Sequence, residues 1–433
     1  MLGSLNPSPH DHQEEDPSTT DLQYRRITQP SSPAIQMRQL LISCAELISH
    51  SDFSAAHRLI SILSTHSSPY GDSTERLVHQ FVRALSLRPN HTHATVSAFI
   101  LNTSNATTSI TTNTTTTTAT NMSNITNFDS SLQSSYLSLN QITPFIRFSH
   151  LTANQAILEA IEVGQQAIHI LDFDIMHGVQ WPPLMQALAE RSNDTLLPPP
   201  MLRITGTGHD LNILQRTGDR LLKFAHTLGL RFQFHPLLIL NDDPTSVARY
   251  LPSALTLLPD EALAVNCVLY LHRLLKDDSR DLRLFLHKIK ALNPKVVTIA
   301  EREANHNHPL FLQRFVEALD HYTAIFDSLE ATLPPNSRER LAVEQIWFGR
   351  EIVDIVAAEG DNRRERHERF ESWEVILRSS GFANVPLSPF ALSQAKLLLR
   401  LHYPSEGYQL QIFNNSFFLG WQNRPLFSIS SWR

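Results

Sequence analysis

The chain has 433 residues, of which 42% are apolar and 18% charged, and its net charge is −6. This length accommodates one large domain or two ordinary ones, and the composition is typical of a globular protein. Acidic and basic residues are mixed along the chain, which disfavours a compact nucleic-acid-binding domain with a basic surface. No apolar run is long enough to cross a bilayer and the polar start lacks the pattern of a signal peptide, so we expect no contact with a membrane.

The first part of the chain is predicted to be helical, with two segments that do not fold. Residues 1–33 are rich in Pro, Ser, Asp and Gln, which predicts a disordered tail. Residues 34–150 are predicted to form a helical cap, because "MRQLLISCAELI" places Leu40, Leu47 and their apolar neighbours on one helical face. A Thr- and Asn-rich run inside the cap predicts a disordered insertion at about 98–131.

The second part, residues 151–433, is predicted to be an α/β core. Apolar strands alternate with helices, which indicates a parallel sheet covered on both faces. Near the C-terminus, two strands flank the turn Asn414–Asn415 and predict an antiparallel hairpin. We therefore predict an α/β fold: a methyltransferase-like, doubly wound, mainly parallel sheet with a C-terminal antiparallel hairpin, plus the N-terminal helical cap. The strands expected in the parallel sheet are "AIHILDF" (167–173), "LRITG" (202–206), "RFQFHPLLIL" (231–240), "EALAVNCVLYL" (261–271) and "KVVTIAE" (295–301).

The first of these strands leads into an acid, Asp172, as in nucleotide-binding units. The glycines that let a cofactor approach the backbone are missing, because Gly178 is the only glycine between Asp172 and Trp181. The second strand ends at Thr205–Gly206, without an acid to hold ribose hydroxyls. The sequence therefore predicts a version of the fold without a cofactor, and a protein that is not an enzyme.

Metal chemistry is not expected either. Asp172, Asp174 and His177 are conceivable ligands, but a helix cap and a hydrogen-bonding network at the sheet end are the favoured roles. His169 lies inside an apolar strand, where a core histidine is the expected role. A further cluster follows the fifth strand and matches no mechanism: Glu301, Glu303, His306 and His308.

Several long blocks resemble the plant GRAS family of transcriptional regulators. "IHILDFDIMHGVQWPPLMQALAER" is similar to the VHIID block, whose five named positions are Ile168, His169, Ile170, Leu171 and Asp172. "LRITGTG", "EREANHNHPLFLQRFVEALDHYTAIFDSLEA" and "REIVDIVAAEG" match blocks that follow it, including the PFYRE region, and "GWQNRPLFSISSWR" matches the SAW block. The resemblance covers about residues 35–433 in the family's order, and is greatest to the lateral suppressor, or SCARECROW-like, branch.

The resemblance implies a nuclear regulator that promotes axillary meristem initiation and shoot branching. Its expected partners are other transcription factors, with homo- or heterodimers of family members, and DNA reached directly or through them. The expected interaction residues are Trp421, Arg424, Trp432 and Arg433 of the SAW block, with Leu40 and Leu47 of the cap. For both tryptophans, filling the core is an equally favoured role.

Two alternatives remain at this stage. One is direct DNA binding, with phosphate contacts from Arg363, Arg364, Arg366 and Arg369 in "NRRERHERF", although a solvated helix face is the favoured interpretation of that stretch. The other is a ligand sensor or methyltransferase with a pocket near Asp172, Asn266 and Glu301.

Overall fold

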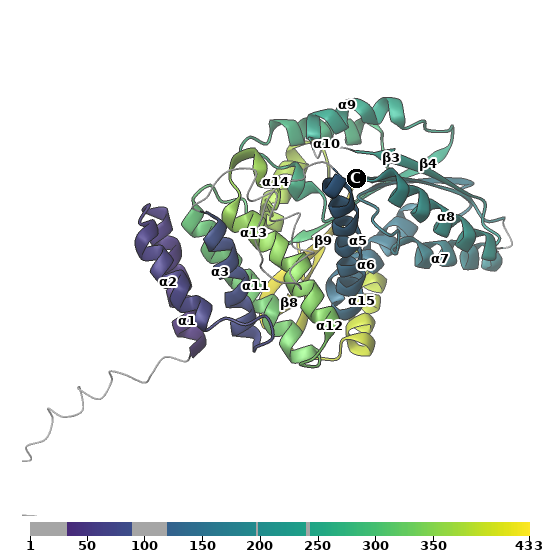
Figure 1. The fold of residues 1–433 in the computed structure, drawn as a ribbon. Coiled ribbons are helices and arrows are strands. Elements are labelled where there is room, and N and C mark those ends of the chain that lie inside the picture. Colours follow the sequence, from purple (N-terminus) through teal and green to yellow (C-terminus); the bar gives the residue numbers. More distant parts are fainter. Residues whose placement is uncertain (1–32, 89–118, 196–197, 240–242) are drawn as a thin grey trace, which may run out of the picture.

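A computed structural model describes residues 33–88, 119–195, 198–239 and 243–433 (Figure 1). Its centre is a sheet in the order β3-β2-β1-β4-β5-β9-β8-β7, with the short β6 paired to β9. Neighbours from β3 to β5 are parallel, and β5 pairs with β9 antiparallel. The predicted fold class is confirmed. The strands are β1 (Ala167–Phe173), β2 (Met201–Gly208), β3 (Phe232–Leu238), β4 (Glu261–Val268), β5 (Val296–Arg302), β6 (Asn384–Val385), β7 (Tyr408–Phe413), β8 (Ser416–Trp421) and β9 (Arg424–Trp432).

Helices cover both faces of the sheet (Figure 1). Successive side chains of a strand point to opposite faces. In β1, Ile168 and Ile170 therefore join the core under α7 and α8, while Leu171 and Phe173 join the core under α9 and α10. The helices are α1 (Pro33–Ser49), α2 (Phe53–Thr65), α3 (Ser73–Leu87), α5 (Ala119–Ile142), α6 (Pro144–Ala160), α7 (Trp181–Thr195), α8 (Leu211–Thr227), α9 (Pro244–Ala254), η3 (Leu271–Leu274), α10 (Arg280–Ala291), α11 (Phe311–Thr332), α12 (Arg338–Ala342), η4 (Val343–Phe348), α13 (Gly349–Ala357), η5 (Gly360–Asn362), α14 (Phe370–Ser379) and α15 (Pro389–His402).

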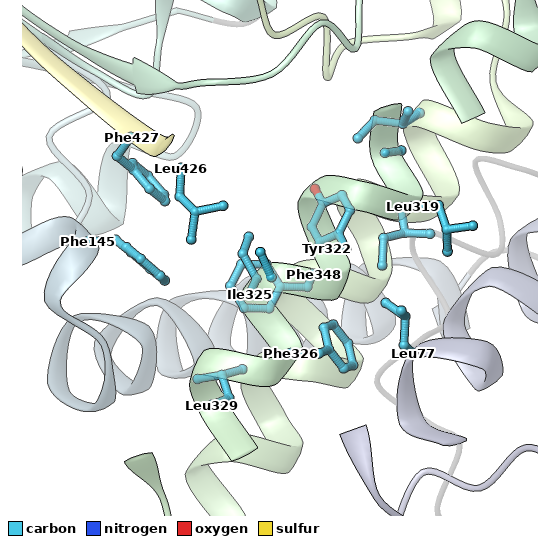
Figure 2. Close-up of a cluster of buried hydrophobic side chains, with 14 of the residues drawn as sticks. Leu77, Phe145, Leu319, Tyr322, Ile325, Phe326, Leu329, Phe348, Leu426 and Phe427 are labelled. Carbon is cyan, nitrogen blue, oxygen red and sulfur yellow. The ribbon is translucent and has the colours of Figure 1, made fainter. Parts of the chain in front are cut away.

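The helical cap and the α/β core share one hydrophobic cluster. Figure 2 shows Leu77 of α3 beside α11, and Phe145 of α6 beside Phe427 of β9. The rings of Phe145 and Phe427 are stacked with centroids 4.7 Å apart. Helix α6 itself crosses the boundary predicted between residues 150 and 151. Helices from both sides of that boundary bury apolar side chains in the same cluster.

A buried ion pair also joins the two parts. Arg76 of α3 donates from Nε to Glu344 Oε2 of η4 at 2.8 Å, and each side chain is 2% exposed. Arg76 also reaches Glu330 of α11 at 2.8 Å. Removing one partner of such a pair leaves a buried charge uncompensated, which costs about 3–5 kcal/mol.

Most of the predicted tail and insertion lies outside the described residues, which leave out 1–32 and 89–118. Residues 119–131, the last part of the predicted insertion, belong to helix α5 in the structure. The far end of α5 is anchored by the buried Tyr136, whose ring lies 5.5 Å from that of Trp347. Once that end is fixed, adding residues to an existing helix costs little, even where few apolar side chains are present.

The C-terminal hairpin forms at the predicted turn. Strands β7 and β8 pair from Tyr408–Trp421 to Phe413–Ser416. Asn414 and Asn415 between them have φ of 41° and 62°, the left-handed conformation that a two-residue hairpin turn requires and asparagine tolerates. Among the described helices, none has the length and apolar character needed to cross a membrane.

Candidate functional site

The carboxyl ends of β1 and β4 open into a cavity of about 150 Å³ beneath α5 and η4. This is the sheet edge at which α/β folds place their ligands. The cavity is lined by side chains from the end of β1, the segment after β4, the end of β5 and residues 364–367, together with residues of α5, α6 and 347–351. Most of these side chains are polar or charged, so their pairing decides what the cavity can do.

Asp172 at the end of β1 is fully engaged by neutral donors. Asn266 of β4 donates to its Oδ1 at 2.7 Å, and the Trp181 indole donates to its Oδ2 at 2.8 Å. Asn266 in turn bonds to Gln180 and accepts from Thr298. Burial raises the pKa of Asp172 to about 7, while the two hydrogen bonds act in the opposite direction. The carboxyl group thus fixes β1, β4 and the start of α7 to one another.

The segment after β1, residues 174–176, packs against the carboxyl end of the sheet. A Cβ atom added at Gly206 would lie 2.8 Å from Cδ1 of Ile175, so this isoleucine covers the end of β2. Asp174 and Met176 adopt left-handed φ angles of 61° and 49° without being glycine. The Asp174 carboxylate pairs with Arg273 at 2.5 Å. The side chains of this segment therefore cover the end of β2 and line one wall of the cavity.

Three ionisable side chains contact one another in a row at the end of β5. His272 of η3 approaches Glu301 Oε2 through Nδ1 at 2.7 Å and Glu365 Oε2 through Nε2 at 3.1 Å. Burial alone would lower the pKa of His272, but these two carboxylates raise it to about 9. Burial alone would raise the pKa of Glu365, yet the His272 imidazolium and nearby arginines lower it to about 2. The side chains of His272, Glu301 and Glu365 are all buried.

His367 lies beside this row and completes the His–Glu cluster of His272, Glu365 and His367. Its ring stacks on that of His272, with centroids 4.2 Å apart. Its Nε2 lies 3.4 Å from Glu365 Oε2 but makes no hydrogen bond to any described residue. Burial and the neighbouring His272 cation hold the pKa of His367 well below its usual range, so this ring is neutral. Its Nδ1 faces Nδ1 of His306 at 3.0 Å.

Arg302 closes the inner wall of the cavity. It donates to Glu351 at 2.6 Å, and Tyr322 donates to the other oxygen of the same carboxylate at 2.8 Å. Arg302 is 0% exposed, and its guanidinium lies 5.0 Å from the ring centre of Phe427. Burial raises the pKa of Glu351 although the Arg302 charge opposes it. The short ion pair favours the charged form of both groups.

Comparison with known proteins decides the family. The GRAS domain family model matches residues 37–433. The chain belongs to the GRAS family. It is 56% identical to Scarecrow-like protein 18 of Arabidopsis thaliana, over 92% of this chain and 91% of that protein. It is 45% identical to Protein MONOCULM 1 of Oryza sativa subsp. japonica, over 92% and 88%.

A solved GRAS structure has the same fold. The crystal structure of SCL7 from Oryza sativa superposes with a TM-score of 0.72 and 34% identity, over 93% of this chain and 100% of that one. GRAS relatives of this chain, among them SCARECROW-like, MONOCULM 1 and DELLA proteins, are plant developmental regulators and are named as regulatory proteins rather than as enzymes.

The residues of the VHIID block are structural. Ile168, Ile170 and Leu171 are buried, and Asp172 holds the network described above. His169 accepts from Arg203 at Nδ1, at 2.9 Å, and bonds to Thr205 through Nε2, at 2.8 Å. Burial, and then the positive charge of Arg203, lower the pKa of His169 to about 3. In this chain the five residues that resemble the VHIID block therefore lie inside the sheet.

The SAW-block residues divide between core and surface. Trp421 and Trp432 are buried, which supports their role in filling the core, and Trp432 donates to Ser430 at 2.8 Å. Arg424 is 30% exposed and pairs with Glu317 at 3.1 Å. The side chain of Arg433 is exposed while its backbone pairs with Ala383. In the cap, Leu40 and Leu47 are half-buried against the shared hydrophobic cluster.

The basic stretch is not a solvated helix face, and that interpretation was wrong. Residues 363–369 have no regular secondary structure, because Asp354 accepts the backbone N–H groups of Arg364 and Glu365 at 2.9 and 2.8 Å. Arg363 and Arg366 are 4% and 1% exposed and donate to groups inside the protein, which removes them as phosphate contacts. The exposed candidates are Arg364 and Arg369, and Arg369 already pairs with Glu317.

Sequence reasoning did not single out His272, Glu365 or His367. Of the ligand-pocket candidates, Asp172 and Asn266 do meet, whereas Glu301 turns to His272 and the backbone of Leu271. The available signal was the position of His272 directly after an apolar strand, at the edge where carboxyl ends gather. Glu365 and His367 lie among alternating charged residues, so no local pattern indicated that they are buried.

Proposed function

We propose that this GRAS protein is a nuclear regulator of transcription that promotes axillary meristem initiation and shoot branching. It acts by recruiting or bridging DNA-bound transcription factors. The relation to Scarecrow-like protein 18 and MONOCULM 1 over nearly the whole chain supports the developmental role. Arg363 and Arg366 are buried and the exposed Arg369 is paired with Glu317, which favours recruitment over direct DNA binding.

An apolar stripe on the outer face of α15 supports the recruitment of transcription factors. Phe390, Leu397 and Leu401 follow one another at helical spacing and are 59%, 44% and 61% exposed. The opposite face of the helix is buried through Ala391 and Ala395. Exposed apolar side chains gathered on one helix are a feature of protein-binding surfaces. We assign the α15 stripe as the recruiting surface.

The test is enrichment of sequences from a random DNA pool by the purified chain, at low and physiological salt, with and without plant nuclear extract. Recruitment predicts selective enrichment only with extract, and its loss in Leu397→Asp/Leu401→Asp. Lys396→Asp, on the exposed polar side of the same helix, is the matched control and should behave as the wild type. Enrichment by the pure protein with a steep dependence on salt would support direct DNA binding instead.

The developmental role has its own test. The wild-type chain, expressed in a plant that lacks a related GRAS protein and branches poorly, should restore lateral shoots. The Leu397→Asp/Leu401→Asp protein, present at equal amount in the nucleus, should not. Equal rescue by both proteins would reject the α15 stripe, and rescue by neither would reject the developmental role.

A further inference from the structure

The His–Glu cluster lies at the cavity with three ligand atoms that face one another. His272 Nε2 lies 3.1 Å and His367 Nε2 3.4 Å from Glu365 Oε2, and all three atoms are within 4.8 Å of one another. A tetrahedral zinc site with bonds of about 2.0–2.1 Å separates its ligand atoms by about 3.3 Å. Two of the three separations match this value, and the third is at most 4.8 Å.

In one of the two tautomers of the His306–His367 pair, an acceptor of His367 faces the acceptor oxygen of Glu365. His306 and His367 meet through their Nδ1 atoms, so one ring donates to the other. When His367 donates there, its Nε2 carries a lone pair directed at the Glu365 carboxylate. His367 is 0% exposed, and this Nε2 has no hydrogen-bond partner among the described residues. A cation between the three atoms would satisfy them together.

The surroundings of the cluster also resemble those of a metal site. Glu301 holds His272 through Nδ1 at 2.7 Å, the carboxylate–histidine pairing that orients metal-bound imidazoles. All three side chains line the cavity, so a fourth coordination position would face its interior. Two imidazoles and one carboxylate are a ligand set suited to zinc and related divalent cations.

We propose that His272, Glu365 and His367 form a binding site for a divalent transition-metal cation such as Zn²⁺ at the carboxyl edge of the sheet. Binding replaces the proton on His272 Nε2, which is released to solvent. The cation ties the segment after β4 to residues 365–367 and so closes one side of the cavity. This site lies apart from the α15 stripe and does not depend on the proposed function.

The test is metal binding by the purified full-length chain after removal of metal with a chelator. The wild type should retain one Zn²⁺ per chain through gel filtration, unfold at a higher temperature with Zn²⁺ than without it, and give the visible absorption of tetrahedral Co²⁺. Glu365→Gln and His367→Gln should lose all three properties. Glu301→Gln should weaken binding by about 10–100-fold, because it removes only the group that orients His272.

His308→Gln is the matched control. His308 lies two residues from His306, and its ring accepts from the backbone N–H of Leu310 and is not among the three ligands, so this variant should bind as the wild type does. Substoichiometric zinc on the wild type, or equal binding by Glu365→Gln, would overturn the proposal. If both ligand variants fail to fold, the stoichiometry and the Co²⁺ spectrum of the wild type decide the question.

Discussion

The two halves of the sheet edge differ in whether the buried polar side chains named below have hydrogen-bond partners. Around β1 and β4, the side chains of Asp172, Asn266 and Gln180 satisfy one another, and within the described residues none of their buried atoms lacks a hydrogen bond. Around β5, described side chains of Arg302, His306 and His367 leave buried nitrogens without one. Satisfied networks stabilise a fold, whereas unsatisfied buried groups mark sites that bind something or store strain. The difference separates a scaffold from a candidate site.

The largest expected effect concerns the β5 half. Arg302→Met should lower the free energy of unfolding by about 3–5 kcal/mol, because it leaves the buried Glu351 carboxylate without its cation. Urea denaturation measures this change. The double variant Arg302→Met/Glu351→Leu should recover part of the loss. A single substitution that costs less than about 1 kcal/mol would show that the pair is solvated and not buried.

The β1 half should respond less strongly. Asp172→Asn places an amide N–H against a donor from Trp181 or Asn266, which should cost about 1–3 kcal/mol in urea denaturation. Asp260→Asn is the control, because Asp260 is exposed and its left-handed φ of 61° suits asparagine. Equal stability of the two variants would contradict the scaffold role of Asp172.

The pH dependence of the same half follows from His169. Its folded pKa of about 3 lies below that of the unfolded chain, so folding excludes a proton. The contribution of neutral His169 to the free energy of unfolding is therefore complete above about pH 6.5. It is lost as the pH falls, by up to about 1.4 kcal/mol for each pH unit. The free energy of unfolding of the wild type should fall relative to His169→Gln between pH 6.5 and 5. Parallel curves would show that His169 is protonated in the fold.

The smallest effect belongs to the surface. Arg369 is 53% exposed and pairs with Glu317, so Arg369→Ala should change the free energy of unfolding by less than about 1 kcal/mol. It should also leave enrichment of the DNA pool in nuclear extract unchanged. Loss of enrichment in this variant, with an unchanged free energy of unfolding, would show that Arg369 contacts DNA phosphate.

Much of the fold could be predicted because its signals are local. Continuous apolar runs such as "AIHILDF" mark strands buried on both faces, and Asn414–Asn415 marks the hairpin. The start of α5 could not be predicted, since that helix is fixed by Tyr136 packing against Trp347, which lies far along the chain.

The candidate site was harder to predict for a related reason. The alternating charges of "RRERHER" are typical of a solvated helix, and only the distant Asp354 and His272 reveal that Glu365 is buried. Glu365 and His272 are 93 residues apart in sequence. A metal was not expected from the sequence because these ligands have no characteristic spacing, whereas Asp172, Asp174 and His177 lay close together and attracted attention. In the fold, Asp172 and Asp174 are committed to Trp181, Asn266 and Arg273.

The contrast between the two halves of the sheet edge is tested most directly by anomalous X-ray scattering at the zinc absorption edge, from crystals equilibrated with Zn²⁺. We expect one peak at about 2.0–2.2 Å from His272 Nε2, Glu365 Oε2 and His367 Nε2, and none beside Asp172. A peak at Asp172, Asp174 and His177, or no peak at the His–Glu cluster, would contradict it.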